Sequence, residues 1–200
     1  MRIIKIALIF IAVMLTGCAS NPMKLTQDKP LLTPSQEQVQ VVFMRDSFLG
    51  HAINGSLYDV TNGEPEFLGI IANDTKVTQM TQPGKHVYMV VSEAADFLEA
   101  ELEGGKTYFS VVTPRMGAWK ARFSLWPYKQ DTSAEYVLDG SEFKSVLKGT
   151  KYAELTAKAN AWYSANKDSV KAKQAKYWPV WEKKSPEDIL KRTLQPQDGK

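Results

Sequence analysis

Cysteine and histidine are scarce in this chain, and their scarcity limits its chemistry. Among 200 residues there is one cysteine, Cys18, and there are two histidines, His51 and His86. A single cysteine excludes a disulfide within the chain and a multi-cysteine zinc site. Neither an H-E-x-x-H motif nor a G-x-S-x-G nucleophile motif occurs. We therefore predict no metal, no cofactor and no catalytic residue, and we expect the protein not to be an enzyme.

Long hydrophobic runs are also few, and the most marked one is at the N-terminus. Arg2 and Lys5 accompany an apolar run over residues 6–15. The run has the length of the hydrophobic part of a secretory signal and is too short to span a bilayer as a helix. It ends in "LTGC", residues 15–18. This ending resembles the lipobox of bacterial lipoproteins, which implies cleavage before Cys18 and acyl chains on its sulfur and its amine.

The lipobox resemblance implies a location as well as an anchor. Residues 1–17 would be the signal peptide, and acyl chains on Cys18 would hold the protein on a membrane, because each buried methylene contributes about 0.8 kcal/mol. Ala19, not Asp, follows the cysteine, which implies sorting to the outer membrane on its periplasmic side. The alternative is an ordinary secretory signal with a chance cysteine.

Basic and acidic residues are balanced overall but unevenly distributed. Residues 18–139 hold 10 basic and 15 acidic side chains, whereas residues 140–200 hold 13 basic and 7 acidic ones. This predicts an acidic body and a basic C-terminal part. The candidate surface for an envelope protein or an anionic lipid comprises Lys167, Lys171, Lys173, Lys176, Trp178 and Trp181. The alternative is that the aromatic residues pack helices onto the body, and nucleic acid is excluded by the compartment.

Proline, glycine and hydrophobic spacing divide the mature chain into three parts. Residues 18–36 are polar and contain three prolines, which predicts a flexible tether. Residues 37–130 alternate apolar and polar residues between turn signals such as Asn62-Gly63, which predicts an antiparallel β-sandwich. Residues 139–194 change to helical spacing and predict a basic helical extension at the C-terminus.

Three features of the helical extension carry more detailed predictions. One helix face is predicted to hold Tyr152, Leu155, Ala159 and Trp162. Ser185 and Pro186 have the residue types of an N-cap and a first helical position, so a helix is expected to begin there. Pro179 is predicted to break or kink the helix before it.

The turn signals of the sandwich also carry a resemblance. "PGKHVYMVV" is followed by an acidic strand and "LEGGKTYFSVV", and the earlier "VVFMRDSFLGHA" holds Arg45 and Gly50 after a strand. Over residues 39–128 this resembles an uncharacterised family of small bacterial lipoprotein β-sandwich domains, similar in layout to PEGA and carboxypeptidase-regulatory-like modules. The resemblance implies a mainly β, antiparallel sandwich of prealbumin- or immunoglobulin-like layout, with no established catalytic residues.

His86 is predicted to pack a turn and not to carry out chemistry. It follows Pro83-Gly84 and begins an alternating strand, on one face with Tyr88 and Val90. A metal site or a general base would need partners, and the other histidine, His51, is 35 residues away. The sequence offers His86 no partner of that kind.

Two classes of function remain after this reading. The preferred one is a non-enzymatic scaffold or interaction module that its lipid holds at the membrane surface. The second is a module that binds a glycan or a peptidoglycan fragment through aromatic faces such as Trp119 or Trp126. Saturable binding to isolated peptidoglycan that falls in Trp126→Ala would favour the second class.

Overall fold

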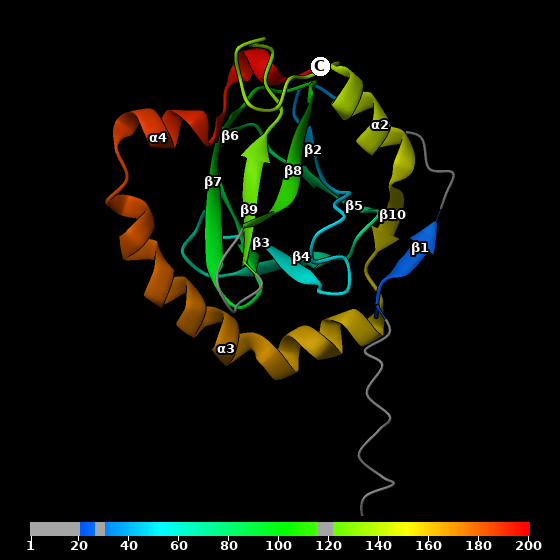
Figure 1. The fold of residues 1–200 in the computed structure, drawn as a ribbon, viewed down its shortest axis with the longest axis vertical. Helices are drawn as coiled ribbons and strands as arrows, with labels where there is room; N and C mark the ends of the chain where they lie inside the picture. The colour runs from blue at the N-terminus through cyan, green and yellow to red at the C-terminus, as the bar shows by residue number, and fades with distance from the viewer. Residues whose placement is uncertain (1–20, 27–30, 116–121) are drawn as a thin grey trace, which may run out of the picture.

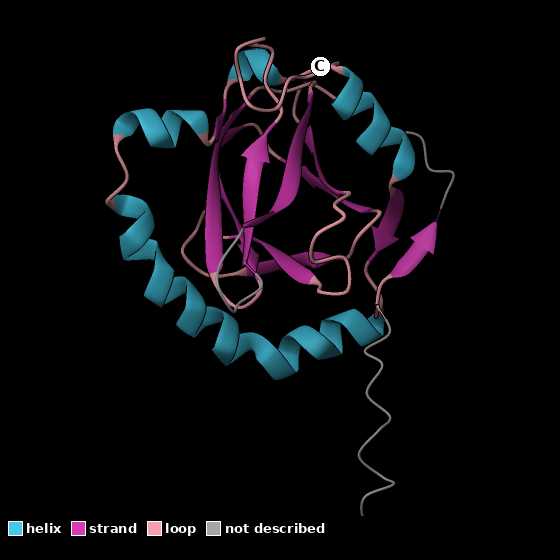
Figure 2. Cartoon of the chain, viewed as in Figure 1, coloured by secondary structure: helices cyan, strands magenta, loops and turns pink. Residues whose placement is uncertain are grey.

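A computed structural model describes residues 21–26, 31–115 and 122–200 of the chain. Two β-sheets pack face to face, and helices lie against their outer faces (Figure 1; Figure 2). The predicted signal peptide and Cys18 lie outside the described residues, and so does Trp119, one of the two tryptophans suggested for glycan binding.

Within the described part of the chain, the first sheet has six strands and the second has five. The order across the first sheet is β1 (Lys24–Thr26), β10 (Lys151–Glu154), β5 (Thr75–Thr81), β2 (Val39–Arg45), β8 (Thr107–Arg115) and β9 (Arg122–Pro127). The order across the second sheet is β11 (Thr193–Leu194), β7 (Ala95–Leu102), β6 (Gly84–Val91), β3 (Gly55–Asp59) and β4 (Glu66–Ile71). The predicted hairpin around Asn62-Gly63 is confirmed as β3 and β4.

Both sheets are mixed, which corrects the predicted antiparallel topology. β2 is parallel to β8, β5 is parallel to β10, and β7 is parallel to β11. Alternating side chains reveal a strand, but they do not reveal its direction relative to a neighbour, because direction depends on the connections between strands. The mainly β, sandwich-like class is confirmed.

Helices cover the outer faces of both sheets. The helices of the described chain are α2 (Ser141–Gly149), α3 (Ala157–Glu182), α4 (Pro186–Lys191) and the short 3-10 helix η1 (Pro196–Asp198). Phe143 and Val146 of α2 pack on the first sheet, and Val170 and Trp181 of α3 pack on the second. α3 curves along one end and one side of the sandwich (Figure 1). Among the described helices, none is both long enough and apolar enough to cross a membrane.

The predicted helical extension contains two strands as well as its helices, because β10 and β11 extend the edges of the two sheets. Tyr152 lies in β10 and Leu155 follows that strand, so the predicted helix face with Ala159 and Trp162 is wrong in its first half. The backbone hydrogen-bonding groups of β10 are satisfied by pairing with β5. The spacing of apolar side chains in the sequence does not reveal such a pairing. α3 also continues through Pro179 to its end three residues later, whereas the start of α4 at Ser185 is confirmed.

The predicted flexible tether is shorter than residues 18–36, because residues 21–26 belong to the folded body. The Met23 side chain is buried and packs on Gly69. The contact is so close that a Cβ atom added at position 69 would lie 2.8 Å from the Met23 Cε. The Thr156 hydroxyl donates a hydrogen bond of 2.6 Å to the carbonyl of Pro22. The chain therefore enters the body at a fixed point beside the start of α3 (Figure 1).

Candidate functional site

His86 lies near the beginning of β6, on the face of that strand that points between the sheets. Tyr88 and Val90 on this face belong to the core between the sheets, whereas Met89 and Val91 pack toward α3. The predicted alternation along β6 is therefore confirmed. The imidazole stacks on Tyr88 with 5.8 Å between ring centroids, and 11 % of the His86 side chain is exposed.

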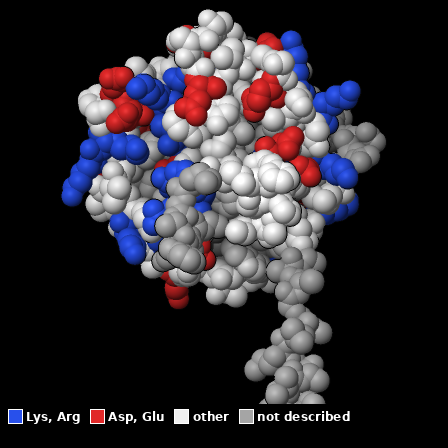
Figure 3. Space-filling view, viewed as in Figure 1, with Lys and Arg blue, Asp and Glu red and all other residues white. Residues whose placement is uncertain are grey.

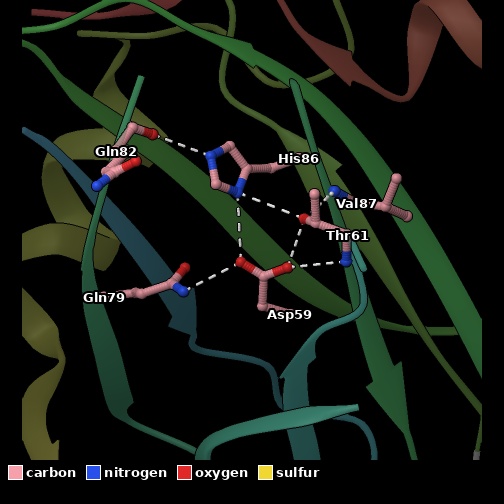
Figure 4. Close-up of polar contacts among 6 residues, drawn as sticks. All are labelled: Asp59, Thr61, Gln79, Gln82, His86 and Val87. Atoms are coloured by element: carbon pink, nitrogen blue, oxygen red, sulfur yellow. Dashed lines mark hydrogen bonds and ion pairs between the residues drawn. The ribbon is translucent and has the colours of Figure 1, made fainter. Parts of the chain in front are cut away.

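Both ring nitrogens of His86 have hydrogen-bond partners (Figure 4). Nδ1 lies 3.3 Å from Asp59 Oδ2, and Nε2 lies 2.9 Å from the carbonyl oxygen of Gln82. Both partner atoms accept hydrogen bonds, so this arrangement favours the doubly protonated imidazolium, which donates to each of them. Asp59 and His86 thus form an ion pair at the edge of the core.

The Asp59 carboxylate is kept ionised by its neighbours. Thr61 donates to it from its backbone and its hydroxyl, and the Gln79 amide donates from 3.1 Å away. Burial would raise the pKa of Asp59, but the hydrogen bonds from His86, Thr61 and Gln79 outweigh it and lower the pKa to about 2. Burial also opposes the charge on His86, yet its hydrogen bonds to Asp59 and Gln82 raise its pKa.

These residues, which we call the His86 cluster (Asp59, Thr61, Gln79, Gln82 and His86), join β3, β5 and β6. A general base needs a nitrogen directed at a substrate, whereas both nitrogens of His86 face partners within the chain. Across the described residues, no three His, Cys, Asp or Glu side chains are grouped so that they could hold a metal ion. The geometry is that of a packing cluster.

Replacing His86 with Gln is expected to destabilise the protein most at acidic pH. Folding raises the pKa of His86, so its charge stabilises the native state below the unfolded pKa of about 6.5. This stabilisation is lost as the pH rises through the folded pKa. We expect His86→Gln to lower the free energy of unfolding by about 1–3 kcal/mol at pH 5 and by less at pH 9. Urea unfolding at the two pH values measures the difference.

His51→Gln is the matched control for this experiment, because His51 is exposed and its Nδ1 lies 3.3 Å from the carbonyl of Phe48. We expect this control to change stability little at either pH. The Asp59 contribution is present above about pH 4 and is lost toward pH 2, so it does not vary between pH 5 and pH 9. An effect of His86→Gln that is equal at both pH values would contradict a charged His86.

The predicted partner-binding tryptophans lie at the end of α3 and pack on the body. Trp181 is 3 % exposed, and its Nε1 donates a hydrogen bond of 3.1 Å to Glu99. Trp178 packs edge-on against Phe97, with 5.0 Å between ring centroids. These contacts match the packing alternative that the sequence left open, and they fasten α3 to β7.

The predicted partner-binding lysines divide into two pairs. Lys171 forms an ion pair of 2.5 Å with Glu64, and Lys173 donates to a backbone carbonyl at the end of β6. Lys167 and Lys176 are exposed on the outer side of α3. The structure therefore leaves part of the predicted set on the surface and uses the rest to hold the helix.

A groove of about 920 Å³ lies between α3 and one end of the second sheet. Pro22 lines it where the chain enters the body. The other walls include Ala52 and Ile53 from the loop after β2, and Trp162 and Val170 from α3. The groove thus joins the entry point of the chain to an otherwise distant loop.

Hydrogen bonds from Arg45 hold the loop over residues 46–54, between β2 and β3, in place. The buried Arg45 guanidinium donates to the carbonyl of Ile53 at 2.5 Å and to that of Gly50 at 2.6 Å. Burial lowers the pKa of Arg45 to about 10, so the group stays charged at neutral pH. The loop in turn presents Phe48 to solvent with 91 % of its surface exposed.

A second pocket, of about 530 Å³, lies between β9 and α4. Trp126 and Tyr136 give it aromatic walls, and Asp131 and Glu135 give it carboxylates. The Arg192 guanidinium lies 4.4 Å from the centre of the Trp126 ring. This site contains one of the two tryptophans that the sequence suggested for glycan binding.

Sequence reasoning missed the acidic partners inside the molecule. Asp59 follows the apolar stretch of β3, and Asp96 stands within the apolar run "AADFL". An acidic residue inside such a run signals a buried partner, but the partners, His86 and Arg192, are far away in the sequence.

Comparisons with protein-family models, with curated proteins and with solved structures found no match. The class that the structure defines is a mainly β, sandwich-like protein with mixed sheets and helices on both outer faces.

Proposed function

We propose that this protein is a lipid-anchored envelope protein that acts as a non-enzymatic scaffold or interaction module at the membrane surface. The proposal takes Cys18 as the acylated residue and the periplasmic side of the outer membrane as the location. It also assigns residues 39–128 to the lipoprotein sandwich family with a PEGA-like, prealbumin- or immunoglobulin-like layout.

The observation that carries the proposal is the entry point of the chain. The carbonyl of Pro22 accepts a hydrogen bond from Thr156, and Met23 is buried in the core. Cys18 precedes Pro22 by four residues, and four extended residues span at most about 14 Å. An acyl anchor at Cys18 would therefore hold the folded body directly against the membrane.

The exposed surface of α3 supports an interaction role. Of its 26 residues, Ala159, Val170 and Trp181 are buried, and a helix of this length extends about 39 Å. Exposed Lys167 and Lys176 make its outer side basic. The partner that this surface favours is an envelope protein with an acidic face, and an anionic lipid headgroup is the other outcome to test.

Metabolic labelling with radioactive palmitate tests the anchor. We expect label on the wild-type chain in the outer-membrane fraction and no label on Cys18→Ala. An unlabelled wild-type chain in the soluble periplasmic fraction would contradict the proposal.

Crosslinking from native membranes tests the interaction surface. The comparison is between the wild-type chain and a variant with Lys167→Glu and Lys176→Glu, which leaves the buried side of α3 intact. We expect the variant to lose a crosslinked protein that the wild type captures, and to lose it more completely at low salt. A set of crosslinked products unchanged by the variant would place the interaction elsewhere.

The second pocket supports a second candidate function, the binding of a glycan or peptidoglycan fragment. Trp126 and Tyr136 could stack on the apolar face of a sugar ring, while Asp131 and Glu135 accept hydrogen bonds from its hydroxyl groups. Its volume of about 530 Å³ suits a ligand of one or two sugar units.

Trp126→Ala is expected to weaken saturable binding to isolated peptidoglycan by about two- to tenfold, because a stacked aromatic face contributes about 0.5–1.5 kcal/mol. Trp162→Ala is the matched control, since Trp162 is partly exposed and lies outside this pocket. Sedimentation of the protein with purified peptidoglycan measures both variants, after circular dichroism has verified folding. Equal binding by the wild type and Trp126→Ala would count against this function.

A further inference from the structure

Several exposed apolar side chains gather where the chain enters the body. Ile53 and Trp162 line the same groove as Pro22, and both are more than one-third exposed. Leu155 is about half exposed and directly precedes Thr156, the residue that bonds to Pro22. Apolar surface is thus concentrated beside Pro22, near the point where the described part of the chain begins.

The loop over residues 46–54 extends this surface. Phe48 is 91 % exposed and Leu49 is 52 % exposed. The hydrogen bonds from Arg45 to Gly50 and Ile53 hold the backbone of the loop in place, so the two side chains are presented by a supported loop. We call this surface the entry face, and it comprises Phe48, Leu49, Ile53, Leu155 and Trp162.

The entry face is apolar and does not carry charge of a single sign. Lys158 and Glu93 both line the groove. Figure 3 shows a broad area of the body without charged side chains. Isolated exposed apolar residues are common, but a contiguous patch marks an interaction site. Attraction to this face should therefore depend on apolar contact more than on net charge.

We propose that the entry face docks on the phospholipid bilayer that carries the acyl anchor, with Phe48 and Leu49 inserted between headgroups and Trp162 at the interface. This inference rests on the proposed function, because it takes Cys18 as acylated. Phe, Leu and Trp are the side chains that enter the interfacial region of a bilayer.

The bilayer is the favoured occupant because few residues separate Cys18, the proposed site of acylation, from Pro22, where the chain enters the body. Cys18 can lie no more than about 14 Å from Pro22, so a membrane that holds the acyl chains meets this face of the body before any other. A second copy or another protein would have to compete with a lipid surface that is already adjacent. The geometry thus sets the orientation of the body as well as its distance from the membrane.

A single engineered thiol can test this orientation, because an acylated Cys18 has no thiol and the chain has no other cysteine. Exposed Ala52 lines the groove, whereas exposed Gln197 lies in η1, at the end of the molecule away from α3 (Figure 1). The acylated full chain with Ala52→Cys or Gln197→Cys is labelled with a fluorophore and reconstituted into phosphatidylcholine vesicles. Quenching is then measured with nitroxide-bearing lipids and, separately, with aqueous iodide.

We expect lipid nitroxides to quench the label at residue 52 several-fold more than the label at residue 197, and iodide to show the opposite order. Adding Phe48→Ser and Leu49→Ser should reduce the lipid quenching at residue 52 to the level at residue 197. The matched control adds Val180→Ser and Leu190→Ser, which remove exposed apolar side chains away from the entry face and should leave the quenching unchanged. Equal lipid quenching at the two labels would overturn the inference. Protection of residue 52 from iodide that disappears when the protein is diluted in the membrane would also overturn it, because such protection comes from contact between protein molecules.

Failure of the anchor and failure of the docking give different results. If palmitate labelling is absent, the proposed function fails, and docking is then measured by adding vesicles to an unacylated chain in which Cys18→Ser leaves the engineered cysteine as the single thiol to be labelled. Lipid-dependent quenching at residue 52 that the serine pair lowers about tenfold or more would still support docking. Lack of quenching at any vesicle concentration would refute it.

Discussion

A chain stopped after Asp139 is expected not to fold. The missing part contains β10 and β11, which extend the two sheets. It also contains α3, which covers the outer face of the second sheet. Without α3, the fully buried side chains of Tyr58, Met89 and Phe97 would face water. Each such exposure costs about 1.5–3 kcal/mol, and several together approach the total stability of a domain, about 5–15 kcal/mol.

Circular dichroism, proton NMR and limited proteolysis measure the outcome. The truncated chain should lack dispersed amide signals and should be cut rapidly, whereas a full chain with Lys167→Ala and Lys176→Ala should resemble the wild type. A truncated chain with a cooperative unfolding transition would show that residues 37–130 fold alone and that the basic C-terminal part is an appendage. Surface substitutions on α3, and not truncation, are therefore the appropriate way to test for a partner.

Arg192→Ala is expected to lower the free energy of unfolding by about 3–5 kcal/mol, because it removes the buried partner of the Asp96 carboxylate and leaves only the more exposed Arg115, 3.6 Å away, to pair with it. Arg192 is buried and forms an ion pair with Asp96, and it donates to the carbonyl of Leu125 at 2.6 Å. Its guanidinium also lies between the rings of Trp126 and Trp181. Burial lowers the pKa of Arg192, and Asp96 opposes that shift.

Two controls separate the ion pair from the packing around it. Lys191→Ala removes an exposed cation that pairs with Glu187 and should change stability by less than about 1 kcal/mol. Combining Arg192→Met with Asp96→Leu removes both charges, and it should recover part of the loss because no buried charge remains unpaired. Urea unfolding measures the series, and a double variant as unstable as the sum of its single variants would contradict a coupled pair.

Local patterns predicted the local structure well. In β6, Tyr88 and Val90 belong to the core between the sheets as their alternation predicts, and the capping residues at Ser185 begin α4. The parallel pairing of β2 with β8 and the strand at Lys151–Glu154 could not be predicted in the same way. They depend on contacts between distant segments, which leave no periodic signal in either segment.

The candidate site shows the same division between local and distant information. The turn and the alternation around His86 predicted a packing residue, and the geometry agrees, but Asp59 was not identified as its partner. The partner set on α3 was selected by charge and aromatic content, which do not distinguish a side chain that faces solvent from one that holds a helix in place. Trp181 and Lys173 are of the second kind.

The pairing of β1 with β10 has a consequence for the order in which the chain folds during synthesis. Leu25 lies opposite Ala153, so a chain that is made from its N-terminus presents β1 long before its partner strand. Contacts of such large sequence separation form late and slowly. β1 would therefore stay unpaired until the C-terminal third has been made, and the closing of β10 onto β1 would be a late step of folding.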